Sequence, residues 1–122
     1  RATEPTSLKE VLHTLDKAGE FKAVVLASAD GLLIGTVSTD YDSDVIAAIV
    51  AMLRMVSAET RQQLGMAEVD EITIRSRDHL RLVCRYIITA GENLILVVIA
   101  PFDQCYRRAT NRAIRQIKRL LS

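Results

Sequence analysis

The sequence predicts an α+β fold in which the elements follow the order helix, two strands, helix, three strands, helix. Three observations lead to this prediction. An Asp-Gly pair joins two Val- and Leu-rich segments, a long Ala-rich segment follows them, and three more apolar segments precede a basic helical segment. At 122 residues and 13.5 kDa, the chain is expected to form one domain over residues 1–122.

Residues that start and end helices set the predicted boundaries. Ser7 and Glu10 fit a capping box before the first helix, and Gly19 ends it. The acidic stretch 40–44 suits the positive end of the second helix, and Asp103 is expected to cap the third. The predicted helices are 8–19, 45–64 and 104–121, and the predicted strands are 21–29, 31–38, 69–76, 80–89 and 93–100, with Asp30-Gly31 as the first hairpin turn.

The alternation of apolar and charged residues predicts how each strand lies in its sheet. In the third and fourth strands the apolar positions share one parity, and Arg75, Arg81 and Arg85 occupy the other. One face of these strands is therefore expected to be buried and the other to face water. Segments 24–27 and 94–100 are apolar at both parities, so we expect them at the centre of the sheet, covered on both faces.

The second helix is expected to bury more than one side. Residues 45–53 are all apolar, and a surface helix of a small monomer cannot bury its full circumference. The bulky side is expected to face the sheet, and the small side is expected to face a second copy of the chain. The alternative is that the first or third helix covers the small side within one chain. The bulky side comprises Val45, Ile46, Ile49, Leu53, Val56 and Leu64, and the small side comprises Ala47, Ala51, Met55 and Ala58.

The residue types that act in catalysis or bind metals do not occur at the spacings of any known active-site or metal-site motif. His13 lies beside an apolar helical position, His79 lies in a predicted turn, and the five glycines form no phosphate-binding loop. The carboxylates of 40–44 lack the glycine and terminal glutamate of a calcium loop. Cys84 and Cys105 are expected to be buried free thiols. The sequence therefore predicts no catalysis, no cofactor and no metal site.

Positive charge is concentrated at the C-terminus, where residues 103–122 contain six basic side chains and one acidic side chain. The basic face could be a solvated surface, bind an acidic protein partner, or contact anionic lipid or nucleic acid. Nucleic acid is not expected, because only Tyr106 accompanies this face and the chain has no Trp. No apolar run approaches the roughly 20 residues of a membrane span, and no signal peptide is recognised, so a cytoplasmic protein without membrane insertion is expected. The basic face comprises Arg108, Arg112, Arg115 and Arg119.

Three segments form a recognisable combination with this order of elements. They are the strand running into residues 27–34 (ASADGLLI), the Ala-rich central helix and the closing apolar strand 93–100. Over nearly all of the chain they resemble the Roadblock/dynein light chain family. The resemblance implies a profilin-like fold, in which a five-stranded antiparallel sheet is sandwiched between the central helix and the two terminal helices. It also implies homodimers or family heterodimers formed through the central helix and the third strand, which contains Ile72 and Ile74, with the two sheets joined edge to edge.

The same resemblance implies a function. Prokaryotic members are associated with small Ras-like GTPases as regulators or scaffolds, and the family has no catalytic triad or cofactor. We therefore expect a non-catalytic homodimeric module that binds and regulates or scaffolds such a GTPase, with Arg54, Glu59 and Arg61 as candidate contacts. The basic face of the last helix would then be free for a second partner. The alternative is a small-ligand sensor or a structural adaptor domain whose basic C-terminal helix contacts an acidic partner.

Overall fold

The computed structural model describes residues 5–37 and 40–121 and confirms the predicted order of elements. The strand expected over 31–38 is observed to Val37, and Ser38 lies outside the described residues. The helices are α1 (Leu8–Gly19), α2 (Ser43–Leu64) and α3 (Arg107–Leu121), and the strands are β1 (Ala23–Ser28), β2 (Leu33–Val37), β3 (Glu71–Arg75), β4 (Leu80–Ile88) and β5 (Asn93–Pro101).

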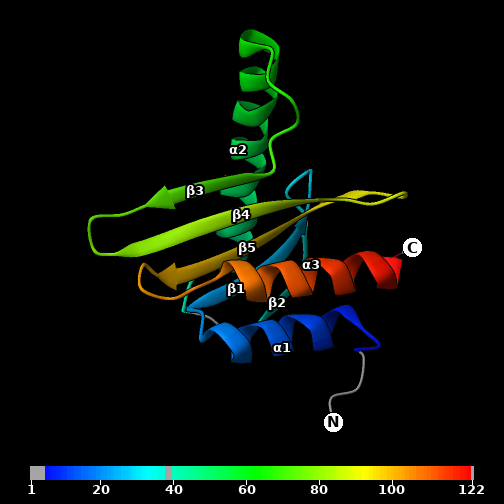
Figure 1. Ribbon diagram of the computed structural model, residues 1–122, viewed down its shortest axis with the longest axis vertical. Coiled ribbons are helices and arrows are strands. Elements are labelled where there is room, and N and C mark those ends of the chain that lie inside the picture. The colour runs from blue at the N-terminus through cyan, green and yellow to red at the C-terminus, as the bar shows by residue number, and fades with distance from the viewer. Residues whose placement is uncertain (1–4, 38–39, 122) are drawn as a thin grey trace.

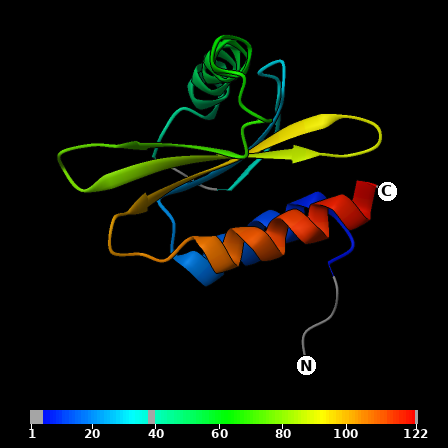
Figure 2. The ribbon, with the colours of Figure 1, turned by 45° about the horizontal axis from the view of Figure 1, so that its top comes forward.

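The five strands form one antiparallel sheet in the order β2-β1-β5-β4-β3. Helix α2 lies on one face, and α1 and α3 lie side by side on the other, as Figures 1 and 2 show. Strand β5 is central and β1 is its neighbour, which confirms the position predicted from their two-sided apolar pattern. Alternate residues of β5 enter the two core layers: Leu96 packs with α1 and α3, and Val97 packs with α2.

Local capping explains where α1 and α2 begin and end, and α1 ends at Gly19 because Glu20 takes the left-handed conformation and its N–H donates to the Asp16 carbonyl. The Ser7 hydroxyl accepts a hydrogen bond from the Glu10 backbone N–H at 3.2 Å, and the Glu10 carboxylate accepts from the backbone N–H of Thr6 rather than of Ser7. The Asp42 carboxylate caps α2 by accepting from the backbone N–H groups of Asp44 and Val45. Gly65 ends α2 in the left-handed conformation, at φ 67°.

The start of α3 differs from the prediction. The helix begins at Arg107, so Asp103 does not cap it. The backbone N–H of Gln104 donates to the carbonyl of Pro101 at 3.1 Å, which makes Asp103 part of a turn that leads from β5 towards α3. The first helical hydrogen bond then joins the Thr110 N–H to the Tyr106 carbonyl.

The side of α2 that packs within the chain also differs from the prediction. Ile46 is buried as predicted, but Ala47 is only 1% exposed, whereas Val56 is 58% exposed. The cause is the β1–β2 turn. A Cβ atom added to Gly31 would lie 2.9 Å from the Ala51 Cβ, so the turn packs directly on the small residues of α2. The small side is therefore needed for close packing within one chain, and much of the bulky side is left in solvent.

The charged face of β4 is covered as well, although it was predicted to face water. Arg85 is 7% exposed and lies beneath α3. Its Nη1 donates to the Thr110 Oγ1 at 2.9 Å and to the Asn111 Oδ1. Arg81 donates from Nη2 to two backbone carbonyls of the β5–α3 connection. Charged residues can be buried where polar partners satisfy them, and α3 and its connection supply those partners.

Glu71 on β3 completes this arrangement and links the edge strand to α3. Its carboxylate accepts hydrogen bonds from the Tyr106 hydroxyl at 2.7 Å and the Thr73 hydroxyl at 2.8 Å, and it lies 3.3 Å from the Arg107 Nη2 and 3.7 Å from the Arg85 Nε. Partial burial raises the pKa of Glu71, but the hydrogen bonds and the two guanidinium groups outweigh it, so the net pKa is lowered. The ionised carboxylate therefore stabilises the contact between β3 and α3.

The close approach of the β1–β2 turn to α2 can be tested with Gly31→Ala. We expect the free energy of unfolding to fall by about 1–3 kcal/mol, because φ is +89° and the added methyl group meets Ala51. Chemical denaturation would measure the loss. Gly65→Ala is the matched control, since Gly65 also has a positive φ but no atom lies near its added Cβ. Equal losses in the two variants would mean that the turn does not press on α2.

The Glu71 contacts predict a pH dependence. Because the pKa of Glu71 is lowered on folding, its stabilising contribution is present at neutral pH and is lost as the pH falls below the ordinary value of 4.5. Glu71→Gln should lower the free energy of unfolding by about 1–3 kcal/mol at pH 7 and by less at pH 3. Denaturation at both values, with exposed Glu92→Gln as the control, would measure this. A loss that does not change with pH would contradict it.

Candidate interaction surfaces

An aliphatic stripe runs along one side of α2 and is exposed to solvent. It consists of Val45, Ile49, Met52 and Val56. The stripe lies on the side of α2 away from the β1–β2 turn, which packs on Ala47 and Ala51, and Leu53 beside the stripe packs against the same core cluster as Ile72 of β3. Exposed apolar residues gathered on one side of a helix are typical of a surface that another protein covers.

Strand β3 is an edge strand, and within the described residues it pairs only with β4. Figure 1 shows that α2 extends past this edge. On the α2 side of β3, Ile74 is 45% exposed and Ile72 is half-buried. The edge therefore offers unpaired backbone groups beside exposed aliphatic side chains, which is the combination that strand addition requires.

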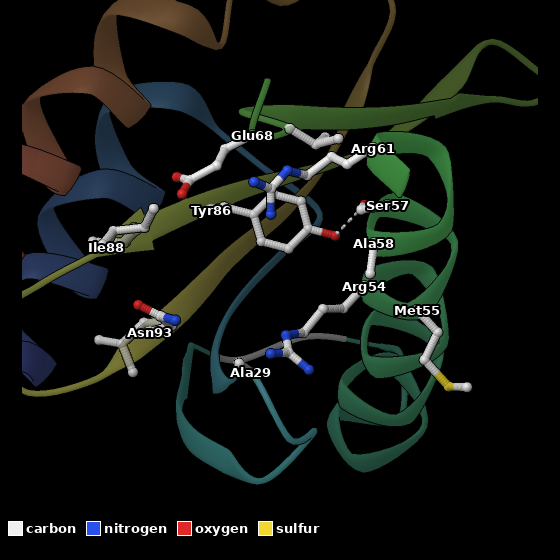
Figure 3. A pocket seen from close by; sticks show the side chains of 13 residues that line it. Ala29, Arg54, Met55, Ser57, Ala58, Arg61, Glu68, Tyr86, Ile88 and Asn93 are labelled. Atoms are coloured by element: carbon white, nitrogen blue, oxygen red, sulfur yellow. Dashed lines mark hydrogen bonds between the residues drawn. The ribbon is translucent and has the colours of Figure 1, made fainter. Parts of the chain in front are cut away.

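The opposite side of α2 borders a pocket of about 410 Å³. Figure 3 shows the pocket between α2, the end of β4 and the start of β5. Met55, Ala58 and Ile88 give the pocket apolar walls. The polar side chains that line it are Arg54, Ser57 and Arg61 from α2, Glu68 from the loop that follows, Tyr86 from β4 and Asn93 from β5.

Tyr86 is held in place at the centre of this pocket. Its hydroxyl lies 3.2 Å from the Ser57 Oγ, and this hydrogen bond is drawn in Figure 3. Burial raises the pKa of Tyr86, and the hydrogen bond to Ser57 only partly opposes this. The phenol is therefore protonated at neutral pH. Because the Ser57 hydroxyl donates to the Leu53 carbonyl at 3.1 Å, the Tyr86 O–H group donates to the Ser57 Oγ.

The residues predicted to form the dimer interface are separated by the structure. Ala47 is buried against its own chain, so it cannot face a partner. Ala51 is half-buried beside Gly31, and Met55 and Ala58 border the pocket instead of the aliphatic stripe. Ile72 and Ile74 do lie on the edge strand, as predicted. The exposed apolar side of α2 is thus the side that was expected to face the sheet.

The predicted contacts for a partner protein are also divided. Arg54 and Arg61 both line the pocket, whereas Glu59 lies outside it and accepts a hydrogen bond from the Gln63 Nε2 at 3.1 Å. Sequence analysis missed Tyr86 as a pocket residue. No local signal indicates this role, because its neighbours in the pocket come from α2 and β5.

The basic face of α3 lies on the other side of the sheet from α2 (Figure 2). All four of its arginines are exposed, as predicted, and the opposite side of α3 is buried through Ala113 and Ile117. The basic face of α3 is therefore a surface separate from the pocket and the aliphatic stripe.

The cysteines and the other metal-ligating residues do not form a further site. Cys84 is buried as predicted, but Cys105 is exposed, and neither forms a disulfide. Burial raises the pKa of Cys84 to about 12, with a smaller contribution from Glu71. In the described ranges 5–37 and 40–121, no three His, Cys, Asp or Glu residues lie close enough together to hold a metal ion. None of the helices in these ranges is long and apolar enough to cross a membrane.

Comparisons with solved structures show the same fold. Myxococcus xanthus MglB is similar with a TM-score of 0.84 and 19% identity, and the match covers 98% of each chain. A Roadblock/LC7 domain from Streptomyces avermitilis has a TM-score of 0.71 and 17% identity, covering 93% of this chain and 96% of that one. Acanthamoeba castellanii profilin II has a TM-score of 0.61 and 13% identity, covering 95% of this chain and 100% of that one. The profilin-like fold is thereby confirmed.

Sequence comparison gives the family directly. No curated protein matches this sequence at a significant level. The profile of the Roadblock/LC7 domain, however, matches residues 7–100, from the cap of α1 to the end of the central strand β5. Together with the sheet order and the positions of the three helices, this match shows that the chain belongs to the Roadblock/LC7 domain family.

Proposed function

We propose that this protein is a homodimeric, non-catalytic interaction module that binds and regulates or scaffolds a small Ras-like GTPase. The observation that carries the proposal is the aliphatic stripe of α2 beside the unpaired edge of β3. Family membership supports the GTPase as the class of partner, because the prokaryotic proteins that this chain resembles are associated with such GTPases.

The first step is the dimer. A second copy related by a twofold axis can pair its β3 with this β3 and can cover the stripe with its own stripe. Exposed Ile74 and Val56 would then be removed from water together. This interface replaces the one expected from the small residues, because those residues already pack on the β1–β2 turn.

The second step is GTPase docking at the pocket side of α2, which this dimer leaves open. Arg54 and Arg61 provide two positive charges there, next to exposed Met55. Charged and apolar groups side by side are typical of a protein interface. Regulation would act by positioning the switch loops of the GTPase, which requires a complementary surface and no catalytic residue from this chain. The basic face of α3, on the other side of the sheet, would be free for a second, acidic partner.

The dimer can be tested with two neighbouring substitutions on α2. Val56→Glu should raise the dimer dissociation constant at least tenfold, because it buries a carboxylate in the apolar interface. Met55→Glu, which introduces the same charge on the pocket side, should leave the dimer intact. Sedimentation equilibrium would measure both against wild-type protein, whose mass should be near twice 13.5 kDa. A monomeric wild type, or dissociation caused by Met55→Glu alone, would contradict the proposed interface.

GTPase docking can be tested by charge reversal. Arg54→Glu combined with Arg61→Glu should weaken binding of a small Ras-like GTPase from the same genome by more than tenfold and leave the dimer intact. Calorimetry with the GTP-bound and GDP-bound forms would measure the affinity. Arg108→Glu combined with Arg112→Glu is the matched control, because it makes the same charge change on the opposite side of the sheet. If only the control pair weakens binding, the docking surface is the basic face of α3.

A further inference from the structure

The pocket beside α2 has the features of a small-molecule site, and we propose that it binds a small apolar monocarboxylate. This inference concerns the isolated protein and does not depend on a GTPase partner. It rests on three properties of the pocket: two guanidinium groups that make no hydrogen bond or ion pair with the described residues, a neutral amide donor near them, and an apolar wall.

The two guanidinium groups give the pocket its affinity for an anion. Arg54 and Arg61 are seven positions apart on α2, so they lie two turns apart on the same side of the helix. Figure 3 shows that both side chains extend from α2 towards the pocket. Neither makes a hydrogen bond or an ion pair with the described part of the chain. An Arg side chain without an internal partner can bind a carboxylate through two parallel hydrogen bonds.

Neutral polar side chains lie beside the two guanidinium groups. The Tyr86 hydroxyl is fixed by Ser57 and lies between the two arginine side chains in Figure 3. The Ser57 hydroxyl donates to the Leu53 carbonyl at 3.1 Å, so the single proton of Tyr86 is donated to the Ser57 Oγ. The neutral donor that remains for a carboxylate oxygen is the Asn93 amide, on the sheet side of the pocket.

The rest of the pocket favours a hydrocarbon body. Met55, Ala58, Val69 and Ile88 form its apolar walls. Pockets that bind small molecules have volumes of roughly 300–1,000 Å³, apolar linings and a few converging polar groups. At about 410 Å³, this pocket lies in the lower part of that range.

The charges of the pocket residues favour a ligand with a single negative charge. Glu68 is the one acidic residue among the side chains that line the pocket, so it offsets one of the two arginines. A phosphate-rich ligand such as a nucleotide would bring several negative charges. The pocket lacks the glycine-rich loop and the helix N-terminus that bind phosphates, since the N-terminus of α2 lies at the far end of that helix. A monocarboxylate with an apolar chain therefore fits best.

The probe pair octanoate and octanamide tests the proposal, because the two molecules differ in charge and hardly in size. Titration calorimetry on the purified protein should give octanoate a dissociation constant of about 1 mM or tighter, and octanamide should bind at least tenfold more weakly. Chemical-shift changes at Tyr86 and Ile88 should locate octanoate in the pocket. Equal affinity for the two probes, no binding of octanoate, or shift changes confined to other residues would overturn the proposal.

Variants provide a second test, in which each substitution has its own expected direction of change in octanoate affinity. Arg54→Gln with Arg61→Gln should remove the preference for octanoate over octanamide, whereas Glu68→Gln should tighten octanoate binding severalfold. Arg112→Gln on α3 is the control for a lost positive charge and should change neither affinity. All four positions are exposed, and thermal unfolding would confirm that each variant is folded. Octanoate binding that weakens equally in Arg112→Gln would show a general charge effect and overturn the site.

Discussion

The contact between the β1–β2 turn and α2 determines which surfaces this protein presents. Gly31 approaches the helix so closely that only small residues fit opposite it, and Ala47 and Ala51 occupy those positions. The contact sets the rotation of α2 about its own axis. The aliphatic stripe is thereby turned outward beside β3, and Arg54 and Arg61 are placed at the pocket on the other side. A different rotation of α2 would move both the stripe and the two arginines to other positions.

The other face of the sheet depends on a polar contact. Arg85 is buried beneath α3, and Glu71 joins the edge strand β3 to the start of that helix. Burying a charge is costly unless polar partners surround it, so these contacts restrict where α3 can lie on the sheet. They also keep the basic face of α3 in solvent. The edge strand that we assign to the dimer is thus connected directly to the helix on the opposite face.

Helix α2 therefore has two sides with different chemistry. The aliphatic stripe suits a second copy of the chain, and the pocket side suits an anionic or acidic group. The proposed dimer leaves the pocket open, so dimerisation and binding at the pocket are compatible. A carboxylate held by Arg54 and Arg61 would, however, occupy the charges that a docking GTPase needs. The two proposed roles of these arginines therefore exclude one another on any one α2, and a small acid could control docking.

The sequence by itself determined the order of the elements, the cap at Ser7, the acidic stretch 40–44 that starts α2, and the central position of β5. These features depend on neighbouring residues or on the apolar pattern of one strand. It could not show that Arg85 is buried, because Thr110 and Asn111 lie 25 and 26 positions further along the chain. It could not identify the pocket, whose residues come from five segments, or the exposed side of α2, which Gly31 decides. For α2 and β4, the packing of elements that are distant in sequence determines which side is covered.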